Sequence, residues 1–392
     1  MTAVRRIALL MGQDIGYTRE VLRGVQAYGQ NRPGWIFRDG PPDPRILAPL
    51  REWKPHGVIA HLFDQKVADA LVKLRVPTVN TTNTLKDLVV PLVEADHVQV
   101  GHLAADYFLD RGFRHFGYFG SSWTGFSRDR EAAFRERVEK RGYPVRSCYA
   151  EYLPRPPVAE SWKGIDAKVR AWLKALPKPV AILSSNDIPA RELAEMCRQL
   201  ELDIPEQVAL LGVDNDELEC HLCKPILSSI ALPSQRIGYE AAKMLHRLMN
   251  RRSLKRRKIF LPPLRVVTRQ STDTLAIQDS DVAEALAFIR NHAHEEISVE
   301  SILEELPMSR RALERKFRDH LGRTVLAEIR RVRLDFVKVL LSDTDLPMPT
   351  IASRCGFSGA RRLAVVFRQI VGITPTAYRA QSKLADSSQN ET

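Results

Sequence analysis

Short apolar runs alternate with helical patterns between residues 7 and 272, and this alternation restricts the fold more than any other feature of the chain. Runs typical of buried strands occupy residues 7–11, 57–63, 77–82, 115–120, 181–185 and 208–214. Segments of helical period separate them, which predicts βαβ units and parallel sheets with helices on both faces. This stretch is longer than one doubly wound unit. We therefore expect two doubly wound lobes that face each other across a ligand-binding cleft.

The strand pattern stops near residue 272. Residues 273–284 have no clear period, and the apolar pattern that follows is helical without strands. We therefore predict an α/β domain over residues 1–272, a linker over 273–284, an all-α domain over 285–382 and a disordered polar tail over 383–392.

Composition excludes several classes of protein. No apolar run is long enough to cross a bilayer, and the first one, Ile7 to Met11, is too short for the core of a signal peptide. The 5 cysteines do not make a disulfide framework in a chain of 392 residues. These observations predict a protein of the cytoplasm that does not enter a membrane.

The basic residues are concentrated near the C-terminal end. The formal net charge is +12, and residues 307–379 contain 15 lysines and arginines against 6 aspartates and glutamates. A local surplus of this kind predicts an acidic partner such as DNA. A second basic run, residues 251–258, falls between a helical pattern and a strand that contains prolines, and we interpret it as a solvated loop.

The first part of this basic region has the pattern of a helix-turn-helix unit. A short helix over residues 298–306 leads through Pro307 to Ser309, the predicted N-cap of a second helix that ends at Gly322. Leu313 and Phe317 lie one turn apart and are expected to face inward. The predicted DNA contacts on this helix are Arg310, Arg311, Arg315 and Arg318.

The scheme repeats after a long amphipathic helix, in which we expect Leu326, Ile329, Phe336 and Leu340 to face inward. Residues 349–355 form a short helix, and Ser358 is the predicted N-cap of the next helix, which buries Leu363, Phe367 and Ile370. The outward residues Arg361, Val365 and Arg368 are the second set of predicted DNA contacts, because guanidinium groups bind guanine edges or phosphate and a methyl group contacts thymine.

Residues 356–379, GFSGARRLAVVFRQIVGITPTAYR, resemble the end of the AraC-type DNA-binding domain. The resemblance implies that Gly372, Thr374, Pro375 and Arg379 belong to a closing signature, and that two recognition helices enter adjacent major grooves of a DNA operator. The chain departs from the family at Leu363, where an aromatic is frequent, and at Val365, where a polar residue is frequent. We therefore assign base reading mainly to the first recognition helix.

The upstream segments VEADHVQVGHLAADYFLDRGFRHFGYFG, RDREAAF, SSND and LLGVDND resemble the periplasmic-binding-protein type I fold, which is the sensor fold of LacI-type regulators. Here the sensor precedes the DNA-binding module. That order resembles a family of sugar-responsive regulators. The resemblance implies a dimeric transcription activator of pentose-use genes, with a pentose, xylose first, as its effector.

Candidate ligand contacts lie at the ends of strands, where open α/β sheets bind ligands. Asp96, Asn186 and Asp214 each follow an apolar run, and carboxylates and amides suit sugar hydroxyls. The resemblance adds Arg130, which lies in an RxxAF arrangement. Trp123, as a stacking surface, and Asp14 complete the set. Aspartate and asparagine are also common N-caps, so a capping role stays open for each.

Other chemistries find little support in the sequence. Cys220 and Cys223 have a spacing used by zinc sites, but no second pair supplies further ligands, so we predict no metal and no cofactor. No phosphate loop or dinucleotide fingerprint is present. Two alternatives stay open: a regulator whose cleft binds a non-sugar ligand or a partner protein, and a sugar-phosphate enzyme with a DNA-binding tail.

Overall fold

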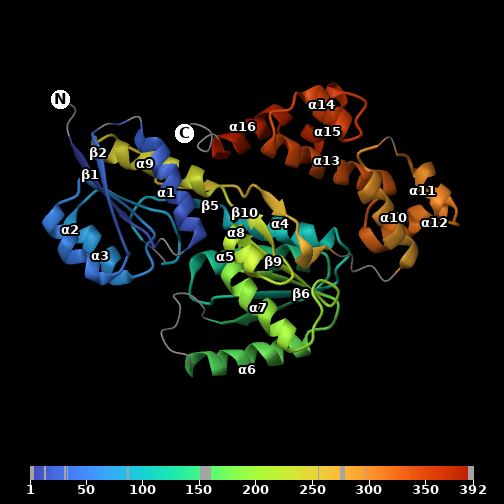
Figure 1. The fold of residues 1–392 in the computed structure, drawn as a ribbon, viewed down its shortest axis with the longest axis horizontal. Helices are drawn as coiled ribbons and strands as arrows, with labels where there is room; N and C mark the ends of the chain where they lie inside the picture. Colours follow the sequence, from blue (N-terminus) through green and yellow to red (C-terminus); the bar gives the residue numbers. More distant parts are fainter. Residues whose placement is uncertain are drawn as a thin grey trace. The chain divides into compact units, whose positions relative to one another are not determined.

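A computed structural model describes residues 4–12, 15–30, 32, 34–85, 88–150, 160–254, 256–273, 279–295 and 297–386. The contacts divide the chain into two compact units: residues 1–108 with 114–274, and residues 275–392 with the segment 109–113. The first is a two-lobed α/β unit and the second is helical (Figure 1), which confirms the predicted fold class. No helix in the described ranges is long and apolar enough to cross a membrane.

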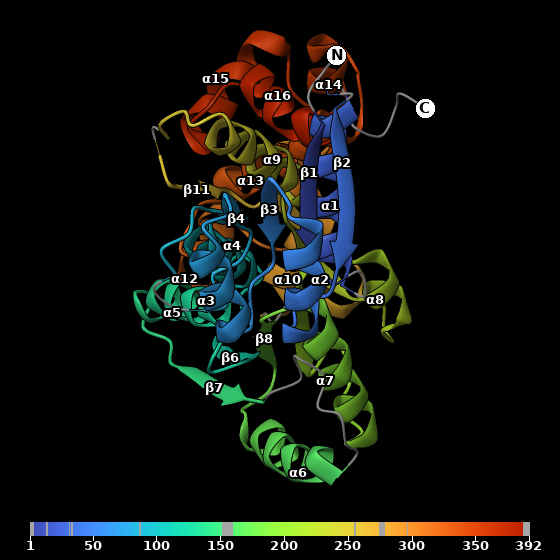
Figure 2. The same ribbon diagram turned by 90° about the vertical axis from the view of Figure 1, so that its left-hand side faces the viewer.

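Lobe 1 of the α/β unit, residues 5–95 and 234–261, contains a six-stranded parallel sheet in the order β11-β5-β4-β3-β1-β2. Figure 2 shows β3, β1 and β2 side by side. The strands are β1 (Arg5–Leu10), β2 (Trp35–Gly40), β3 (Gly57–Ala60), β4 (Thr78–Asn80), β5 (Leu92–Ala95) and β11 (Lys258–Leu261). The helices are α1 (Gly16–Gln30), α2 (Leu47–Trp53), α3 (Gln65–Leu74) and α9 (Ser234–Met249).

Lobe 2, residues 97–231 and 265–272, contains a second six-stranded sheet in the order β12-β10-β9-β8-β6-β7. Only β12 is antiparallel to its neighbour in this sheet. The strands are β6 (His115–Gly120), β7 (Val145–Tyr149), β8 (Val180–Ser184), β9 (Val208–Asp214), β10 (Ser228–Ala231) and β12 (Arg265–Val267). The helices are α4 (His97–Leu109), α5 (Gly125–Glu139), α6 (Glu160–Ala175), α7 (Asp187–Gln199) and α8 (Glu217–Leu222).

The chain crosses between the lobes three times, after β5, after β10 and after β11. Each lobe is therefore built from separate stretches of sequence, and the carboxyl ends of the parallel strands of both sheets border the space between them. This is the arrangement in which α/β sheets bind ligands.

Burial explains which strands the sequence revealed. β3 and β8 are completely buried, so they are continuous apolar runs. β2, at the edge of its sheet, is mostly exposed and carries Arg38 and Asp39, so its sequence lacks that signal. The predicted loop at residues 251–258 is a loop in its described residues as far as Arg257, but Lys258 is the first residue of β11.

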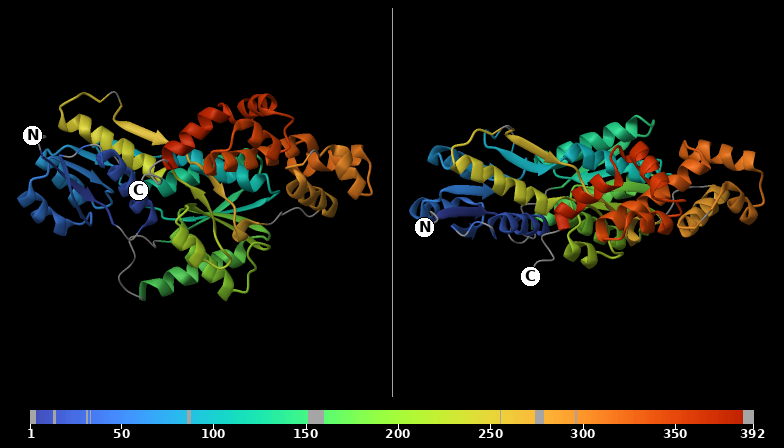
Figure 3. Two further views of the ribbon diagram at one scale, coloured as in Figure 1. Left: turned by 45° about the horizontal axis from the view of Figure 1, so that its top comes forward. Right: turned by 90° about the horizontal axis from the view of Figure 1, so that it is seen from above.

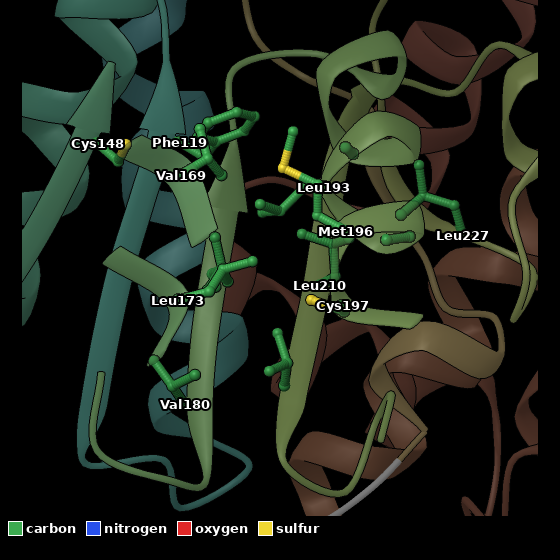
Figure 4. Close-up of a cluster of buried hydrophobic side chains, with 14 of the residues drawn as sticks. Phe119, Cys148, Val169, Leu173, Val180, Leu193, Met196, Cys197, Leu210 and Leu227 are labelled. Carbon is green, nitrogen blue, oxygen red and sulfur yellow. The ribbon is translucent and has the colours of Figure 1, made fainter. Parts of the chain in front are cut away.

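One hydrophobic core of lobe 2 lies between its sheet and helices α6 and α7 (Figure 4). Phe119 and Leu210 from the sheet pack with Leu173 of α6 and Leu193 of α7. Cys220 and Cys223 belong to this core, and burial raises the pKa of both thiols. All five cysteines are free and buried. Within the described residues, no cluster of three or more histidines, cysteines or carboxylates could hold a metal ion.

The helical unit consists of seven helices in its described residues, coloured orange to red in Figure 3. They are α10 (Ser280–His292), α11 (Val299–Glu305), α12 (Arg310–Leu321), α13 (Val325–Asp343), α14 (Met348–Arg354), α15 (Ala360–Val371) and α16 (Pro375–Asp386). α10 starts within the predicted linker, and α16 extends into the predicted disordered tail as far as Asp386. The tail residues 387–392 lie outside the described residues.

Local capping sets the ends of the first recognition helix, as predicted. Ser309 Oγ accepts a hydrogen bond from Ala312 N at 3.2 Å, and Gly322 ends α12 with φ of 66°. Each helix-turn-helix unit has its own core: Leu313 and Phe317 are buried in the first, and Leu363 and Phe367 in the second. The residues of the closing signature serve the fold, because Gly372 ends α15, Pro375 starts α16 and Arg379 donates to Leu346 O.

Three predicted inward residues point outward. Leu326, Phe336 and Ile370 are 46%, 42% and 56% exposed. The prediction is confirmed for Ile329, and the other core positions of α13 are those of Val325, Val332, Leu334, Val337 and Leu341. This helix packs against both cores and so buries a broader, shifted face. The N-cap of α15 is Gly359, one residue after the predicted Ser358.

Candidate ligand pocket and DNA-binding surface

A pocket of about 300 Å³ lies between the two lobes of the α/β unit. Its walls are mostly apolar and aromatic, with Tyr17 and Phe63 from lobe 1 and Trp123 and Phe126 from lobe 2. Polar side chains gather where the strands of lobe 2 end. A concave, largely apolar site with a few convergent polar groups is typical of small-ligand pockets.

Arg130, Asn186 and Asp214 form a polar group on the lobe 2 side of the pocket. Asp214 ends β9 and accepts a hydrogen bond at Oδ2 from Asn186 Nδ2, at 2.7 Å. Its Oδ1 lies 3.8 Å from Arg130 Nη2, and Arg130 Nη1 donates to Ser185 O. Burial raises the pKa of Asp214 to about 6, against the opposing effects of Arg130 and Asn186. The arrangement offers hydroxyl groups both acceptors and donors.

The backbone at Asp214 is strained. Its φ is 111° and that of Asn215 is 55°, values that residues with a side chain rarely adopt. Asp187 holds this turn: its Oδ2 accepts from Asp216 N at 2.8 Å, and its Oδ1 accepts from Ser229 Oγ at 2.6 Å. Asp187 is 1% exposed, and burial raises the pKa of its carboxyl well above the usual range. Strain held in this way is common at ligand sites.

The lobes meet beside the pocket. Asp216 of lobe 2 accepts a hydrogen bond at Oδ2 from Gly16 N of lobe 1 at 2.9 Å, and Arg19 Nη2 lies 3.4 Å from the same oxygen. A Cβ at Gly16 would lie 2.2 Å from that oxygen, so glycine is required for this approach. On the pocket wall, Thr124 Oγ1 is buried and has no hydrogen-bond partner among the described residues.

The structure brings together Trp123, Arg130, Asn186 and Asp214 of the predicted ligand residues. Asp96 does not line the pocket. Its carboxylate accepts hydrogen bonds from Gln99 N at 3.0 Å and Gln99 Nε2 at 2.8 Å, because a short side chain just before α4 reaches the free amide groups of the first turn. Asp14 lies outside the described residues.

Sequence reasoning missed several lining residues, among them Tyr17, His61, His97 and Phe126. Tyr17 donates through its hydroxyl to Thr81 O at 2.8 Å, within lobe 1. His97 directly follows Asp96, so its position just after β5 could have identified it as a candidate pocket residue. Tyr17 and Phe126 start helices after strands, and nothing in their local sequence distinguishes them from core aromatics.

The helical unit presents two arginine faces. Arg310, Arg311, Arg315 and Arg318 of α12 are exposed, as are Arg361, Val365 and Arg368 of α15. Arg310 forms an ion pair with Glu300. Within the described part of the chain no ion pair involves the other arginines of these two faces, so their guanidinium groups have no carboxylate to displace before they bind phosphate or bases.

A two-lobed domain with a pocket between its lobes, joined to a pair of helix-turn-helix units with exposed arginine faces, is the architecture of a ligand-sensing transcription regulator. Residues 105–272 match the model of a periplasmic binding protein-like domain, and residues 302–381 match that of a helix-turn-helix domain. The xylose operon regulatory protein of Escherichia coli is 32% identical over 96% of this chain and 97% of its own length. The xylose operon regulatory protein of Haemophilus influenzae is 29% identical over 95% of this chain and 98% of its own length. The chain belongs to the family of xylose operon regulatory proteins.

A solved structure supports the same assignment. A xylose-binding transcription activator matches 97% of this chain and 99% of its own with a TM-score of 0.61 and 30% identity. Regulators of the LacI family match 69% of the chain at lower identity, among them one from Enterococcus faecium with bound ribose, at a TM-score of 0.56 and 20% identity. The latter similarity concerns the fold of the α/β unit alone.

Proposed function

We propose that the pocket binds a pentose, with xylose as the first candidate, and that binding changes how the helical unit engages a DNA operator. The observation that carries this proposal is the group formed by Arg130, Asn186 and Asp214 opposite aromatic walls. Sugars present hydroxyl groups at their edges and apolar faces between them, and such a pocket matches both. The relatives are xylose operon regulatory proteins and a xylose-binding activator, which favours xylose.

The ligand acts by preferring one arrangement of the lobes. Asp216 joins lobe 2 to the start of α1 in lobe 1 beside the pocket, so a ligand that contacts both lobes stabilises this state. A sugar can shift DNA affinity only by as much as its affinity differs between states. As a regulator that binds a DNA operator, the protein works in the cytoplasm, where it activates pentose-use genes.

Calorimetric titration of the full chain with xylose, arabinose, ribose and glucose tests the ligand. We expect heat of binding from at least one pentose. Silence from all four sugars contradicts the assignment. A fluorescence anisotropy titration of operator DNA, with and without the sugar that binds, then tests the response, and equal DNA affinity in both conditions contradicts sugar control.

A homodimer is part of the proposal, because paired half-sites on DNA suit a two-fold symmetric protein. The outer edge strand β2 supports it: Ile36 and Phe37 are 49% and 36% exposed, and Tyr239 nearby on α9 is 39% exposed. An exposed apolar edge of this kind suits burial against a second copy. Sedimentation equilibrium of Ile36→Asp should show dissociation, whereas Val89→Asp, at an exposed position away from β2, should stay dimeric. A monomeric wild type contradicts the proposal.

A further inference from the structure

The orientation of Arg130 depends on His97, which itself lines the pocket, and on Glu94, which does not. The side chain is 2% exposed, and each part of the guanidinium has a neighbour. Nη1 donates to Ser185 O, Nη2 lies 3.8 Å from Asp214 Oδ1, and Nε donates to His97 Nδ1 at 3.3 Å. The guanidinium also lies over the ring of Phe126, 5.1 Å from its centroid. His97 therefore fixes the Nε end of the guanidinium edge whose other nitrogen, Nη2, lies nearest Asp214.

His97 has both ring nitrogens engaged. A guanidinium can only donate hydrogen bonds, so Nδ1 of His97 is the acceptor and the ring hydrogen is on Nε2. Nε2 in turn lies 3.3 Å from Glu94 Oε2. Burial and the nearby Arg130 lower the pKa of His97 well below its usual value, which keeps the ring neutral and preserves this pattern.

The contacts join elements of both lobes. Glu94 belongs to β5 of lobe 1, His97 is the first residue of α4, and Arg130 lies on α5 of lobe 2. Glu94 and His97 are 2% and 8% exposed. A chain of contacts thus runs from the sheet of lobe 1 to the end of β9 in lobe 2, through Glu94, His97, Arg130 and Asp214. These side chains are buried, and an unpaired charge in such an environment is energetically costly.

We propose that Glu94 and His97 are positioning residues, which hold the Arg130 guanidinium in the orientation that serves the ligand pocket. Glu94 orients the imidazole, and the imidazole accepts from Arg130 Nε, so that Nη2 stays directed toward Asp214. The effect on sugar binding rests on the function proposed above. The contact between His97 and Arg130 exists without a ligand and can be tested without one.

The first experiment is calorimetric titration of full-length variants with the sugar that wild type binds. His97→Phe keeps a ring of similar size but loses the acceptor, so we expect binding to weaken by roughly 10- to 100-fold, because a buried donor is left without a partner. His97→Gln restores one acceptor and one donor and is expected to stay within about threefold of wild type, well under the tenfold cost of a lost hydrogen bond. His102→Phe, the same replacement later on α4, is the control and should bind normally.

Two results of the titration overturn the proposal: normal affinity in His97→Phe, or equal loss in His97→Phe and His97→Gln, which would indicate ring packing rather than hydrogen bonding. A second experiment needs no sugar. A double-mutant cycle of His97→Phe and Arg130→Met, read from urea unfolding of the α/β unit, should show that the two changes are not additive. Additive changes overturn the proposal. If the cycle shows coupling but wild type binds none of the four sugars, only the sugar assignment is refuted.

Discussion

Replacing Glu94 with glutamine is expected to stabilise the α/β unit at neutral and alkaline pH. The carboxyl is 2% exposed, and burial raises its pKa from 4.5 to about 8, against the opposing effect of a backbone hydrogen bond from Asn83. Asp129 adds to this rise, and Arg130 and Lys258 oppose it. The folded protein therefore favours the protonated carboxyl, which glutamine resembles in shape and in its ability to accept from His97.

The sign follows from the difference between the folded and unfolded states. A carboxyl whose pKa is raised by folding contributes its full stability below the unfolded pKa, and this contribution is lost as the pH rises through the folded pKa. For Glu94 the window runs from pH 4.5 to about 8. At about 1.4 kcal/mol per pH unit, the loss reaches at most about 5 kcal/mol, which is a large part of the stability of a domain.

Urea unfolding followed by tryptophan fluorescence measures this loss. All 5 tryptophans precede residue 173, so the signal reports on the α/β unit alone. The free energy of unfolding of Glu94→Gln minus that of wild type should rise steadily from pH 4.5 to 8 and then stay constant. Glu52→Gln, at an exposed position, is the control and should follow wild type at every pH. A difference that is independent of pH, or one that favours wild type at alkaline pH, refutes the reasoning.

Further predictions concern the pocket, the DNA surface and the helical core. Asp214→Ala should abolish sugar binding in calorimetry while the fold survives, because the ligand hydroxyl and Asn186 both lose their acceptor; normal affinity removes Asp214 from the site. Arg311→Ala should cost roughly 1–3 kcal/mol of operator binding and relax specificity at one or two base pairs, whereas equal loss on all sequences would indicate phosphate contact. DNA binding should weaken steeply with added salt through counterion release, and a flat salt dependence would argue against phosphate contacts. Glu328→Ala should destabilise the helical unit by about 3–5 kcal/mol, because the buried Glu328 pairs with Arg323 and Arg331. In urea unfolding followed by circular dichroism, the helical unit of the variant should unfold at a lower urea concentration than that of wild type, and an unchanged unfolding curve contradicts this prediction.

Much of the helical unit could be predicted because its signals are local. Ser309 and Gly322 cap α12 through neighbours within four residues, so the residue types at the helix ends were enough. The arginine faces follow from helical spacing, and those residues are exposed as expected. Ile370 and Phe336 were misplaced because an apolar residue near the margin of a helix face is buried only if a neighbouring helix reaches it.

The α/β unit could be predicted to the level of its strands and of two polar residues that follow them, Asn186 and Asp214, whereas Arg130 on α5 came from the resemblance to the sensor fold. Arg130, Asn186 and Asp214 line the pocket, but Asp96, in an equivalent sequence position, caps α4 instead. Both roles need the same residue types at the same place after a strand. Only the direction of each side chain distinguishes them, and that direction depends on packing.

The order of strands and helices, the two kinds of domain and the basic recognition helices follow from patterns within a few residues of one another. The pocket does not, because its geometry comes from pairs far apart in the chain, such as Gly16 N with Asp216 Oδ2 and Arg130 Nε with His97 Nδ1. The first pair joins the two lobes, and the second joins α4 to α5 within lobe 2, so both form only when tertiary folding brings distant stretches together. Hydrogen bonds and burial in that folded arrangement then give Glu94, His97 and Asp187 properties that their neighbours in sequence do not reveal.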